Sequence, residues 1–296
     1  VRDALFLEAK DKANFIFDQE IIDIDFKNKL LITDSAKYKY DVLVIGSGGV
    51  TLKNSGSDGK ILELLRKKTK LVPSVPAITN YAVKKPYPKA CKGTKLRARA
   101  SLFVDGKKIK ESTDDVIFQS YGLTGTAILD LSNQASHALS KKKDVRVDID
   151  FYPEYSYNTL LEKLKTKAKK YPHRSLDQIL LGFLHENLIG EIIKRSGAKK
   201  TKRKIEALEK ISSYLKKASF DLTDIHDKTN AQVSLGGVAT DRIDPRTMKS
   251  LDIEDTYFIG EVMDVAGDCG GYNIQWAFSS AKACSDDIRR LYVKDK

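Results

Sequence analysis

Glycine and acidic residues gather near the carboxyl end of the chain in a pattern that could receive an anion or an electron-rich carbonyl. A short apolar strand is expected over residues 257–259, a glycine-rich turn follows from Gly260, and a helix is expected to begin near Tyr272. A glycine turn that leads into a helix exposes main-chain N–H groups, and the positive end of the helix dipole adds to their attraction. The stretch therefore predicts a site that faces a cofactor.

A second glycine cluster, Gly46-Ser47-Gly48-Gly49, follows an apolar strand expected over residues 40–45. A strand of this kind suits the centre of a parallel sheet. A dinucleotide-binding fingerprint has the form G-x-G-x-x-G and opens a helix at once, whereas here further turn residues follow and the next helix is expected near Asp58. The spacing leaves two interpretations open, a dinucleotide contact and an ordinary tight turn.

The histidines and cysteines predict no further chemistry. The 4 histidines lack the spacing of metal ligands, and His185-Glu186 lacks the second histidine of H-E-x-x-H, so no metal site is expected. The 3 cysteines contain no C-x-x-C pair, which favours a reducing, cytoplasmic location without disulfides. Cys269 is interpreted as a small turn residue rather than a redox thiol, because it lacks a nearby partner. No residue is assigned as a catalytic acid or base.

Composition describes a folded chain with a basic surface. The 296 residues are 41% apolar and 31% charged, and the formal net charge is +12. Such a charge can attract nucleic acid, but the lysines lie along amphipathic helices and turns, and no nucleic-acid motif accompanies them. We therefore expect a solvated lysine-rich surface and no nucleic-acid partner. Apolar runs are too short to span a membrane, and no signal-peptide pattern opens the chain.

Strands are expected on both sides of the first glycine cluster. The chain is expected to open in a sheet-forming region, with strand-like residues over 13–26 and a hairpin turn at residues 27–29. From residue 95 to 151, short strand-like segments alternate with turns, including separate segments at 107–110 and 116–118. That alternation predicts a small antiparallel barrel.

Residues 154–217 change to a helical period. Ser175 and Gln178 form a capping box, and the apolar stripe that follows is expected to be one helix ending at Gly197. Stripes of this kind are packing surfaces, so a small helical subdomain with lysines on its outer face is predicted.

The order of these groups predicts an α/β fold, α+β overall, that is interrupted in the middle. Residues 1–72 and 236–296 are expected to be two pieces of one domain. Residues 73–153 and 218–235 form the barrel subdomain, and residues 154–217 form the helical subdomain. Insertions of this kind are tolerated at loops whose ends lie close together.

Blocks of sequence across nearly the whole chain resemble one family. They are Gly236-Gly237-Val238-Ala239-Thr240, Ile243-Asp244-Pro245-Arg246-Thr247-Met248, and most of residues 260–280. These blocks closely resemble the C-terminal signature of the BaiN-like FAD-dependent oxidoreductases, also described as the YhiN or aminoacetone-oxidase type. Residues 121–125 with 128–131 resemble that family's insert-domain loop, and residues 44–49 its second contact with the dinucleotide.

The resemblance implies a glutathione-reductase-like FAD-binding domain that is discontinuous and N-terminally incomplete, interrupted by a small β-barrel and an α-helical subdomain. Members of the family begin with a strand and a G-x-G-x-x-G loop that holds the FAD pyrophosphate, and neither is visible in this sequence. An N-terminal FAD segment is therefore expected to be missing. Either the sequence is truncated, or another chain or reading frame carries that segment.

The resemblance also assigns residues to the flavin end of FAD. The start of the last helix, from Gly271 through Tyr272 and Asn273 to Ile274, would face the flavin pyrimidine edge and stabilise negative charge there. Asp268, after Gly267, would accept a hydrogen bond from a hydroxyl on the ribityl or pyrophosphate side.

Five further residues are also assigned roles. Gly260 would permit close approach of the main chain to the cofactor, and Glu261 would be a buried hydrogen-bonding group rather than a base. Gly46 and Gly48 would pass near the adenosine end. Tyr121 would either reach the substrate side of the flavin or pack in the barrel.

The activity that the resemblance implies is hydride transfer between the flavin and a small or steroid-like organic substrate, with NAD(P)H as the electron donor. The competing interpretation is a non-catalytic flavoprotein remnant that acts as a binding or scaffold protein, with its lysine-rich helices against an acidic partner or polyanion. The sequence assigns no oligomeric state.

Overall fold

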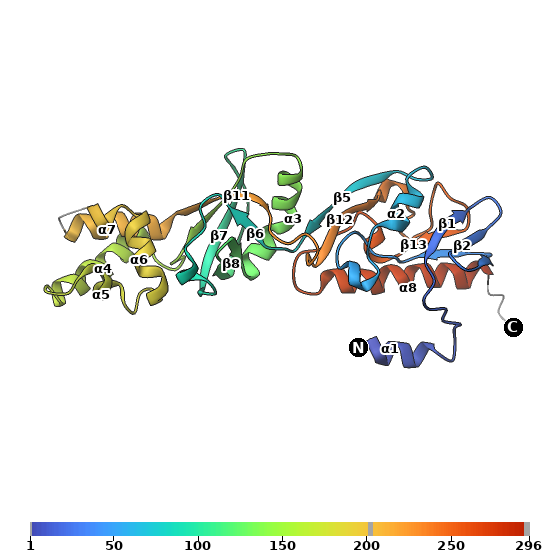
Figure 1. Cartoon of the computed structure of the whole chain (residues 1–296), viewed down its shortest axis with the longest axis horizontal. Coiled ribbons are helices and arrows are strands. Elements are labelled where there is room, and N and C mark those ends of the chain that lie inside the picture. The colour runs from blue at the N-terminus through green and yellow to red at the C-terminus, as the bar shows by residue number, and fades with distance from the viewer. Residues whose placement is uncertain (1, 201–203, 293–296) are drawn as a thin grey trace.

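The structure, a computed structural model, describes residues 2–200 and 204–292 of the chain. It is elongated and has two lobes (Figure 1). The terminal lobe contains β1 to β4, α2, β13 and α8, and the barrel lobe contains β6 to β11 with α3 to α7. A two-stranded sheet of β5 (Leu71–Ala77) and β12 (Val233–Val238) connects them.

The terminal lobe is built on a parallel pair of short apolar strands, β4 (Leu43–Ile45) and β13 (Thr256–Phe258). Helix α8 (Tyr272–Tyr292) packs on this pair, and the buried Tyr257 hydroxyl donates a 2.8 Å hydrogen bond to Asp287 Oδ2 of the helix. The strand pair and the start of α8 lie where the sequence predicts them.

Four shorter elements complete the core of the terminal lobe. They are β1 (Ile21–Asp25), β2 (Leu30–Thr33), β3 (Lys37–Lys39) and α2 (Lys60–Leu65). The three strands form an antiparallel sheet in the order β1-β2-β3, with the predicted turn between β1 and β2. Ile24, Leu62 and Leu65 join β4, β13 and α8 in one apolar cluster.

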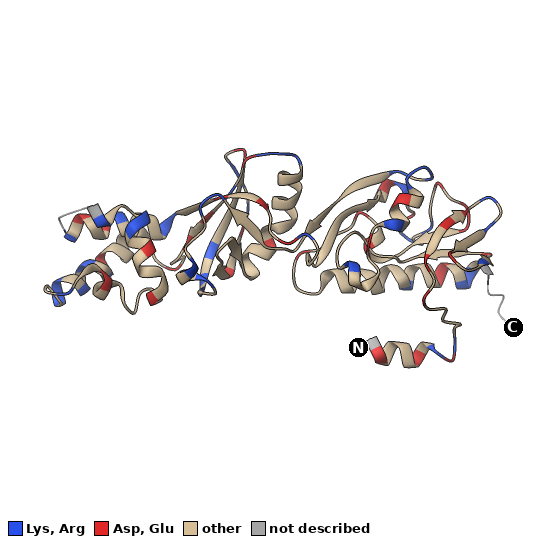
Figure 2. Ribbon diagram, viewed as in Figure 1, with Lys and Arg blue, Asp and Glu red and all other residues tan. Residues whose placement is uncertain are grey.

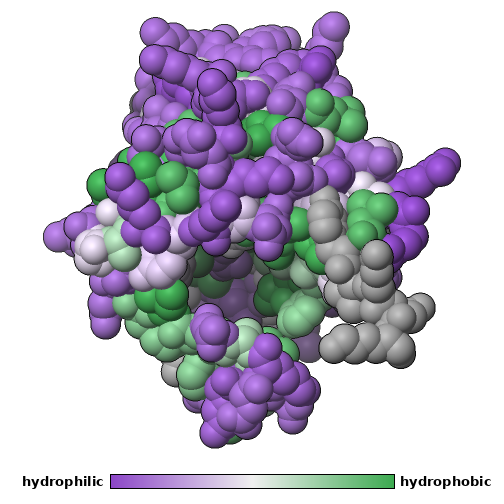
Figure 3. All heavy atoms as spheres, turned by 90° about the vertical axis from the view of Figure 1, so that its right-hand side faces the viewer, coloured by the Kyte–Doolittle hydropathy of each residue, from purple (hydrophilic) through white to green (hydrophobic). Residues whose placement is uncertain are grey.

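The expectation that the chain opens with strands is wrong for its first residues. Residues Arg2–Ala9 form helix α1, which lies apart from the body of the lobe (Figure 1), and only residues 21–25 of the expected stretch form a strand. Phe6, Phe15 and Phe17 contact one another, with ring centroids 5.0 to 6.1 Å apart, although all three side chains are exposed. Figure 3 shows hydrophobic side chains around a hollow at this end of the molecule.

The predicted barrel is present and closed, in the strand order β10-β11-β6-β9-β8-β7. Its strands are β6 (Tyr81–Val83), β7 (Lys95–Val104), β8 (Lys107–Phe118), β9 (Gly122–Thr124), β10 (Val145–Asp150) and β11 (Ala218–Ile225). The two segments expected at 107–110 and 116–118 are one strand, because residues between them pair continuously with β7. Helix α3 (Thr126–Ser140) follows β9. It buries Ile128, Leu131 and Ala135 against the barrel, and these residues lie three and four positions apart on one face of the helix.

Residues 73–77 and 233–235, which the sequence assigned to the barrel subdomain, lie outside the barrel in the connecting sheet. Pro73 and Pro76 explain the difference in part. Proline has no N–H to donate, so it is tolerated in an edge strand such as β5, which pairs on one side with β12.

The helical unit consists of α4 (Tyr157–Lys170), α5 (Leu176–Leu180), α6 (Glu186–Arg195) and α7 (Lys204–Lys216). The capping box is confirmed, since Ser175 N donates to Gln178 Oε1 and Gln178 N donates to Ser175 Oγ. The expected single helix up to Gly197 is wrong. Gly182 adopts φ +79° and breaks it, and the His185 side chain accepts from Asn187 N to cap a new helix.

No helix in residues 2–200 and 204–292 has both the length and the apolar character needed to cross a bilayer.

Candidate cofactor site

The two glycine segments that follow β4 and β13 lie at one edge of the parallel pair. Because the strands are parallel, with Ile45 beside Phe258, their carboxyl ends emerge together. The Ile259 N–H donates to the Ile45 carbonyl at 3.0 Å, and a Cβ added at Gly46 would lie 3.0 Å from Ile259 Cγ1. The fold thus brings Gly46 next to the segment that contains Gly260.

Glu261 links these segments to the connecting sheet by a hydrogen bond. Its Oε1 accepts a 3.1 Å hydrogen bond from Ser234 N of β12, and Ser234 Oγ accepts a 2.8 Å bond from Val50 N. A Cβ at Gly49 would lie only 2.3 Å from Ser234 Oγ. Burial raises the pKa of the Glu261 carboxyl. The side chain is engaged in holding the main chain in place.

Gly48 and Gly260 both require a conformation that glycine adopts most easily. Gly48 has φ +73°, and a Cβ there would lie 2.8 Å from Ser57 Oγ. Gly260 has φ +68° and donates its N–H to Ser280 Oγ of α8 at 2.9 Å. The turn after β13 is therefore tied to the helix that follows it.

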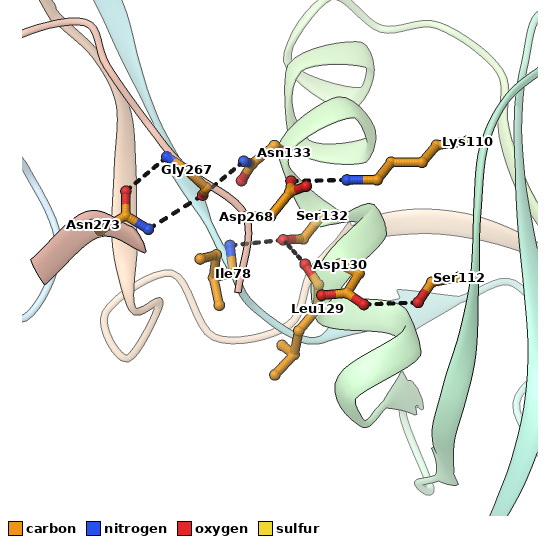
Figure 4. A network of polar contacts seen from close by, with 10 residues as sticks. All are labelled: Ile78, Lys110, Ser112, Leu129, Asp130, Ser132, Asn133, Gly267, Asp268 and Asn273. Atoms are coloured by element: carbon orange, nitrogen blue, oxygen red, sulfur yellow. Dashed lines mark hydrogen bonds and ion pairs between the residues drawn. The ribbon is translucent and has the colours of Figure 1, made fainter. Parts of the chain in front are cut away.

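The loop before α8 is clamped by Asn273 (Figure 4). Its Oδ1 accepts from Gly267 N at 2.8 Å, and its Nδ2 donates to Gly267 O at 3.2 Å. Asn133 Nδ2 of α3 donates to the same carbonyl at 3.2 Å, which joins the barrel lobe to the loop. A Cβ at Gly267 would lie 2.6 Å from Tyr272 Cβ, so a larger residue would force the loop away from the helix.

The first turn of α8 offers unpaired main-chain donors. Gly270 and Gly271 have φ of +119° and +92°, which turns the chain into the helix. The first intrahelical bond to this turn is from Gln275 N to Gly271 O, and within the described residues the N–H groups of residues 272–274 have no acceptor. The side chains of Tyr272 and Ile274 are 64% and 66% exposed, so this turn is open to a ligand.

Asp268 is paired across the two lobes. Its Oδ1 accepts a 2.8 Å bond from Lys110 Nζ of β8, while Ser112 Oγ on the same strand donates to Asp130 Oδ2 of α3 (Figure 4). The Asp268 side chain remains 51% exposed, so its second oxygen can accept another donor. No sequence pattern indicated this pair, whose members are 158 positions apart.

Two buried acceptors that sequence reasoning missed lie nearby on α3. Asn133 Oδ1 and Gln134 Oε1 are buried without a hydrogen-bond partner. Both residues line a cavity of about 720 Å³ between α3 and the connecting sheet, with His137, Gly236 and Asp264 among its other lining residues. An unsatisfied buried acceptor costs roughly 1–3 kcal/mol, so the pair marks a surface suited to ligand donors. In sequence, the signal was two adjacent amides in the helix that follows the glycine-punctuated loop.

Tyr121 lies elsewhere, in the β8–β9 connection of the barrel. Its ring stacks on His226, with centroids 3.4 Å apart and planes 7° apart, and burial raises the pKa of its hydroxyl. In the described part of the chain, no hydrogen bond or ring contact joins Tyr121 to residues 267–273. No group of three His, Cys, Asp or Glu side chains there is arranged to hold a metal ion.

Comparison with known proteins identifies the family. The family described as "HI0933-like protein Rossmann domain" matches residues 1–287. The chain belongs to this family. The resemblance found in the sequence is thereby confirmed, and the Rossmann-type α/β fold with it.

Three relatives of this HI0933-like chain have names that describe a function. It is 28% identical over 267 residues to the 3-dehydro-bile acid delta(4,6)-reductase of Clostridium scindens, covering 88% of this chain and 65% of the relative. It is 34% and 32% identical, over 188 and 189 residues, to the ribosomal RNA dihydrouridine synthases of Escherichia coli and Haemophilus influenzae. Those matches cover 59% and 61% of this chain and 42% and 44% of the relatives. The chain thus spans less than two thirds of the length of each.

The residues present fit the flavin end of FAD, the cofactor that the family suggests. The pyrimidine ring of flavin carries two carbonyl oxygens and one N–H. The HI0933-like chain offers both kinds of partner, three free N–H groups at residues 272–274 and the orphaned acceptors Asn133 Oδ1 and Gln134 Oε1.

Proposed function

We propose that this chain supplies the flavin-facing part of a FAD-dependent reductase that takes electrons from NAD(P)H. The observation that carries the proposal is the open first turn of α8, with unpaired N–H groups at residues 272–274 behind a clamped glycine loop. Membership of the family and the likeness to a reductase of Clostridium scindens support it. When bound, the flavin supplies the two-electron chemistry, and the protein supplies position and electrostatics.

The start of α8 stabilises negative charge at the flavin pyrimidine edge. Its N–H groups and the positive end of the helix dipole point to one place, and donors that are fixed before the reaction need no reorganisation during it. Asn273 maintains that geometry by holding both polar groups of the Gly267 peptide unit. Asp268 is held by Lys110, and its exposed oxygen accepts a hydrogen bond from a hydroxyl group of the ribityl chain.

The glycines after β4, Gly46 and Gly48, would lie along the adenosine end of FAD. Two large apolar side chains of this lobe are exposed, Val44 of β4 at 40% and Phe278 of α8 at 51%. Exposed large apolar side chains of this kind are typical of a surface that a ligand or partner covers.

The experiment that tests this proposal is a titration of the purified protein with FAD, followed by the absorbance and fluorescence of the flavin. We expect Asn273→Ala to weaken FAD binding about tenfold or more, because the loop loses both of its clamping bonds. Gln275→Ala is the matched control, since this exposed side chain lies in the same turn and, among the residues that the structure describes, hydrogen-bonds only Ser279. Equal affinities for the two variants would contradict the assigned site.

A second measurement separates an enzyme from a scaffold. Anaerobic addition of NADH or NADPH to the FAD-loaded protein is expected to bleach the oxidised flavin absorbance. A protein that takes up FAD and is not reduced by either nucleotide would support the non-catalytic alternative.

Two substrate classes are proposed for the reductase, and charge favours the second. By their names, the relatives act on a 3-dehydro-bile acid and on ribosomal RNA. A net charge of +12 suits a polyanionic substrate better than a steroid. Reoxidation of the reduced flavin by a uridine-rich RNA, against a steroid enone, distinguishes the two.

A further inference from the structure

The helical unit at the end of the barrel lobe carries most of the charge of the chain. Residues 154–217 contain 16 lysines and arginines and 7 aspartates and glutamates, a net charge of +9 out of +12. Figure 2 shows basic residues gathered at this end of the molecule, away from the terminal lobe. Charge alone attracts any polyanion, so the kind of partner depends on what lies among the lysines.

An open groove of about 920 Å³ runs along α4 and the segments around α5. Three half-buried aromatic residues and three lysines are among its lining residues: Tyr155, Tyr171, Phe183, Lys163, Lys167 and Lys170. Aromatic rings and cations thus line the same open groove.

The cations lie over the rings. Lys163 Nζ is 4.9 Å from the centroid of Tyr155, and Lys167 Nζ is 5.2 Å from that of Phe183. The Tyr171 ring has two such neighbours, Arg174 at 4.3 Å and Lys170 at 5.5 Å. These contacts fix the side chains beside the groove and leave their charges uncompensated.

The charges at the groove are available to a ligand. In the part of the chain that the structure describes, Lys163, Lys170 and Arg174 form no ion pair with a carboxylate, whereas Lys165 of the same helix pairs with Glu162 and Glu209. A phosphate entering the groove therefore does not have to displace an internal partner of these three cations.

We propose that this groove binds a single-stranded segment of RNA, with bases stacked on Tyr155, Tyr171 and Phe183 and phosphates on Lys163, Lys170 and Arg174. Grooves that hold single strands combine a basic track with aromatic stacking platforms. Unpaired bases expose the faces that such rings need, whereas a duplex hides them. The inference rests on the proposed function in its RNA form and gives that substrate a docking surface.

The position of the groove fits a large substrate. The helical unit and the start of α8 lie on opposite sides of the barrel (Figure 1). A steroid bound at the flavin does not reach the groove, whereas a folded RNA can contact both. Binding energy from this remote contact would hold the RNA while one of its bases is at the flavin.

The first test neutralises two groove lysines. Affinity for a fluorescein-labelled, unstructured single-stranded RNA is measured by fluorescence anisotropy over a range of salt. We expect Lys163→Gln with Lys170→Gln to weaken binding about tenfold, and to reduce the slope of log affinity against log salt by about 1.4. Lys37→Gln with Lys39→Gln is the matched control, because these exposed lysines of β3 change the net charge equally. An equal loss in the control pair would overturn the proposal.

The second test removes a stacking platform. Tyr171→Ala is expected to weaken binding of the single-stranded RNA about fivefold or more. Tyr171→Phe keeps the ring, so its affinity for this RNA should lie within about twofold of that of the wild type. Tyr171→Ala should have little effect on the affinity for a double-stranded RNA of the same sequence. Unchanged single-strand affinity in Tyr171→Ala would overturn the proposal, and so would equal wild-type affinity for single strand and duplex.

Other partners are separated by competition. Vesicles of phosphatidylglycerol and an acidic polyglutamate peptide are added to the RNA complex. If either competitor displaced the RNA at a lower concentration of charge than unlabelled RNA requires, the proposal would be overturned. The groove would then be a binding site for a membrane or for an acidic protein. FAD uptake is measured on the same samples, so that a protein that binds FAD but no RNA refutes the docking surface and leaves the proposed reductase in place.

Discussion

The buried bond between Tyr257 and Asp287 anchors the helix that presents the proposed flavin site, so its removal is the sharpest test of the terminal lobe. Tyr257 is fully buried, and its hydroxyl donates to Asp287 Oδ2 at 2.8 Å. A hydrogen bond to a charged group stabilises a protein by about 1.5–3 kcal/mol. Arg290 still pairs with Asp287 in Tyr257→Phe, so the carboxylate keeps a partner and the loss should be about 2 kcal/mol.

Chemical denaturation measures this loss. We expect the unfolding equilibrium of Tyr257→Phe to shift roughly thirtyfold toward the unfolded state at neutral pH, since about 1.4 kcal/mol corresponds to a factor of ten. Tyr272→Phe is the matched control, because the Tyr272 side chain on the same helix is 64% exposed. If both variants lost the same free energy of unfolding, the anchoring bond would have no special role.

The pH dependence gives a second readout of the same bond. The Arg290 guanidinium and the Tyr257 hydroxyl lower the pKa of Asp287 below its ordinary value of 3.8. A carboxyl whose pKa is lowered by folding adds stability above its unfolded pKa and loses it as the pH falls through the folded value. The difference between wild type and Tyr257→Phe should therefore narrow below about pH 3.8. A difference that is constant with pH would refute the reasoning.

Three further variants test other parts of the structure. Gly237→Ala should destabilise by about 2 kcal/mol or more, because Gly237 has φ +119° and a Cβ there would lie 2.4 Å from Val262 O; Gly56→Ala, with φ +88° and open space, isolates the backbone strain. Burial raises the pKa of Glu261 above its ordinary value of 4.5, so its charged form costs stability as the pH rises through that value. Glu261→Gln, which keeps an acceptor for Ser234 N, should gain stability relative to wild type between pH 4 and 7, and a flat difference in urea denaturation across that range would argue against the burial effect. Lys110→Ala should cost about 1 kcal/mol or less, and less at high salt, since its bond to Asp268 is partly exposed; a larger, salt-independent loss would show that the pair does more than join the lobes.

Local patterns were sufficient for most individual elements. The alternation of strands and turns predicted the barrel, because side chains alternate with a period of two along the strands of a closed barrel as they do in an open sheet. The glycine turn before Tyr272 predicted the start of α8, since glycine tolerates the positive φ that such a turn needs. The helix break at Gly182 was missed because the apolar stripe continues through it, and a stripe does not report the φ angle of one residue.

Contacts between distant parts of the chain were outside the reach of these patterns. Neither spacing nor composition indicated that Asn133 would meet Gly267, or that Lys110 would meet Asp268. The prediction of no nucleic-acid partner considered the lysines along each helix. It did not include the groove, in which Tyr155, just before α4, and Phe183, just after α5, line one surface.

The amino-acid sequence was enough to identify the family, the glycine turns and the order of the barrel and helical units, because each depends on residues that are close together in the chain. Which of these residues share a site depended on the folded arrangement. It set the parallel pairing of β4 with β13, the clamp on Gly267 and the aromatic groove. Each depends on how well packed surfaces fit one another, and that fit is a property of the whole fold and not of any local segment.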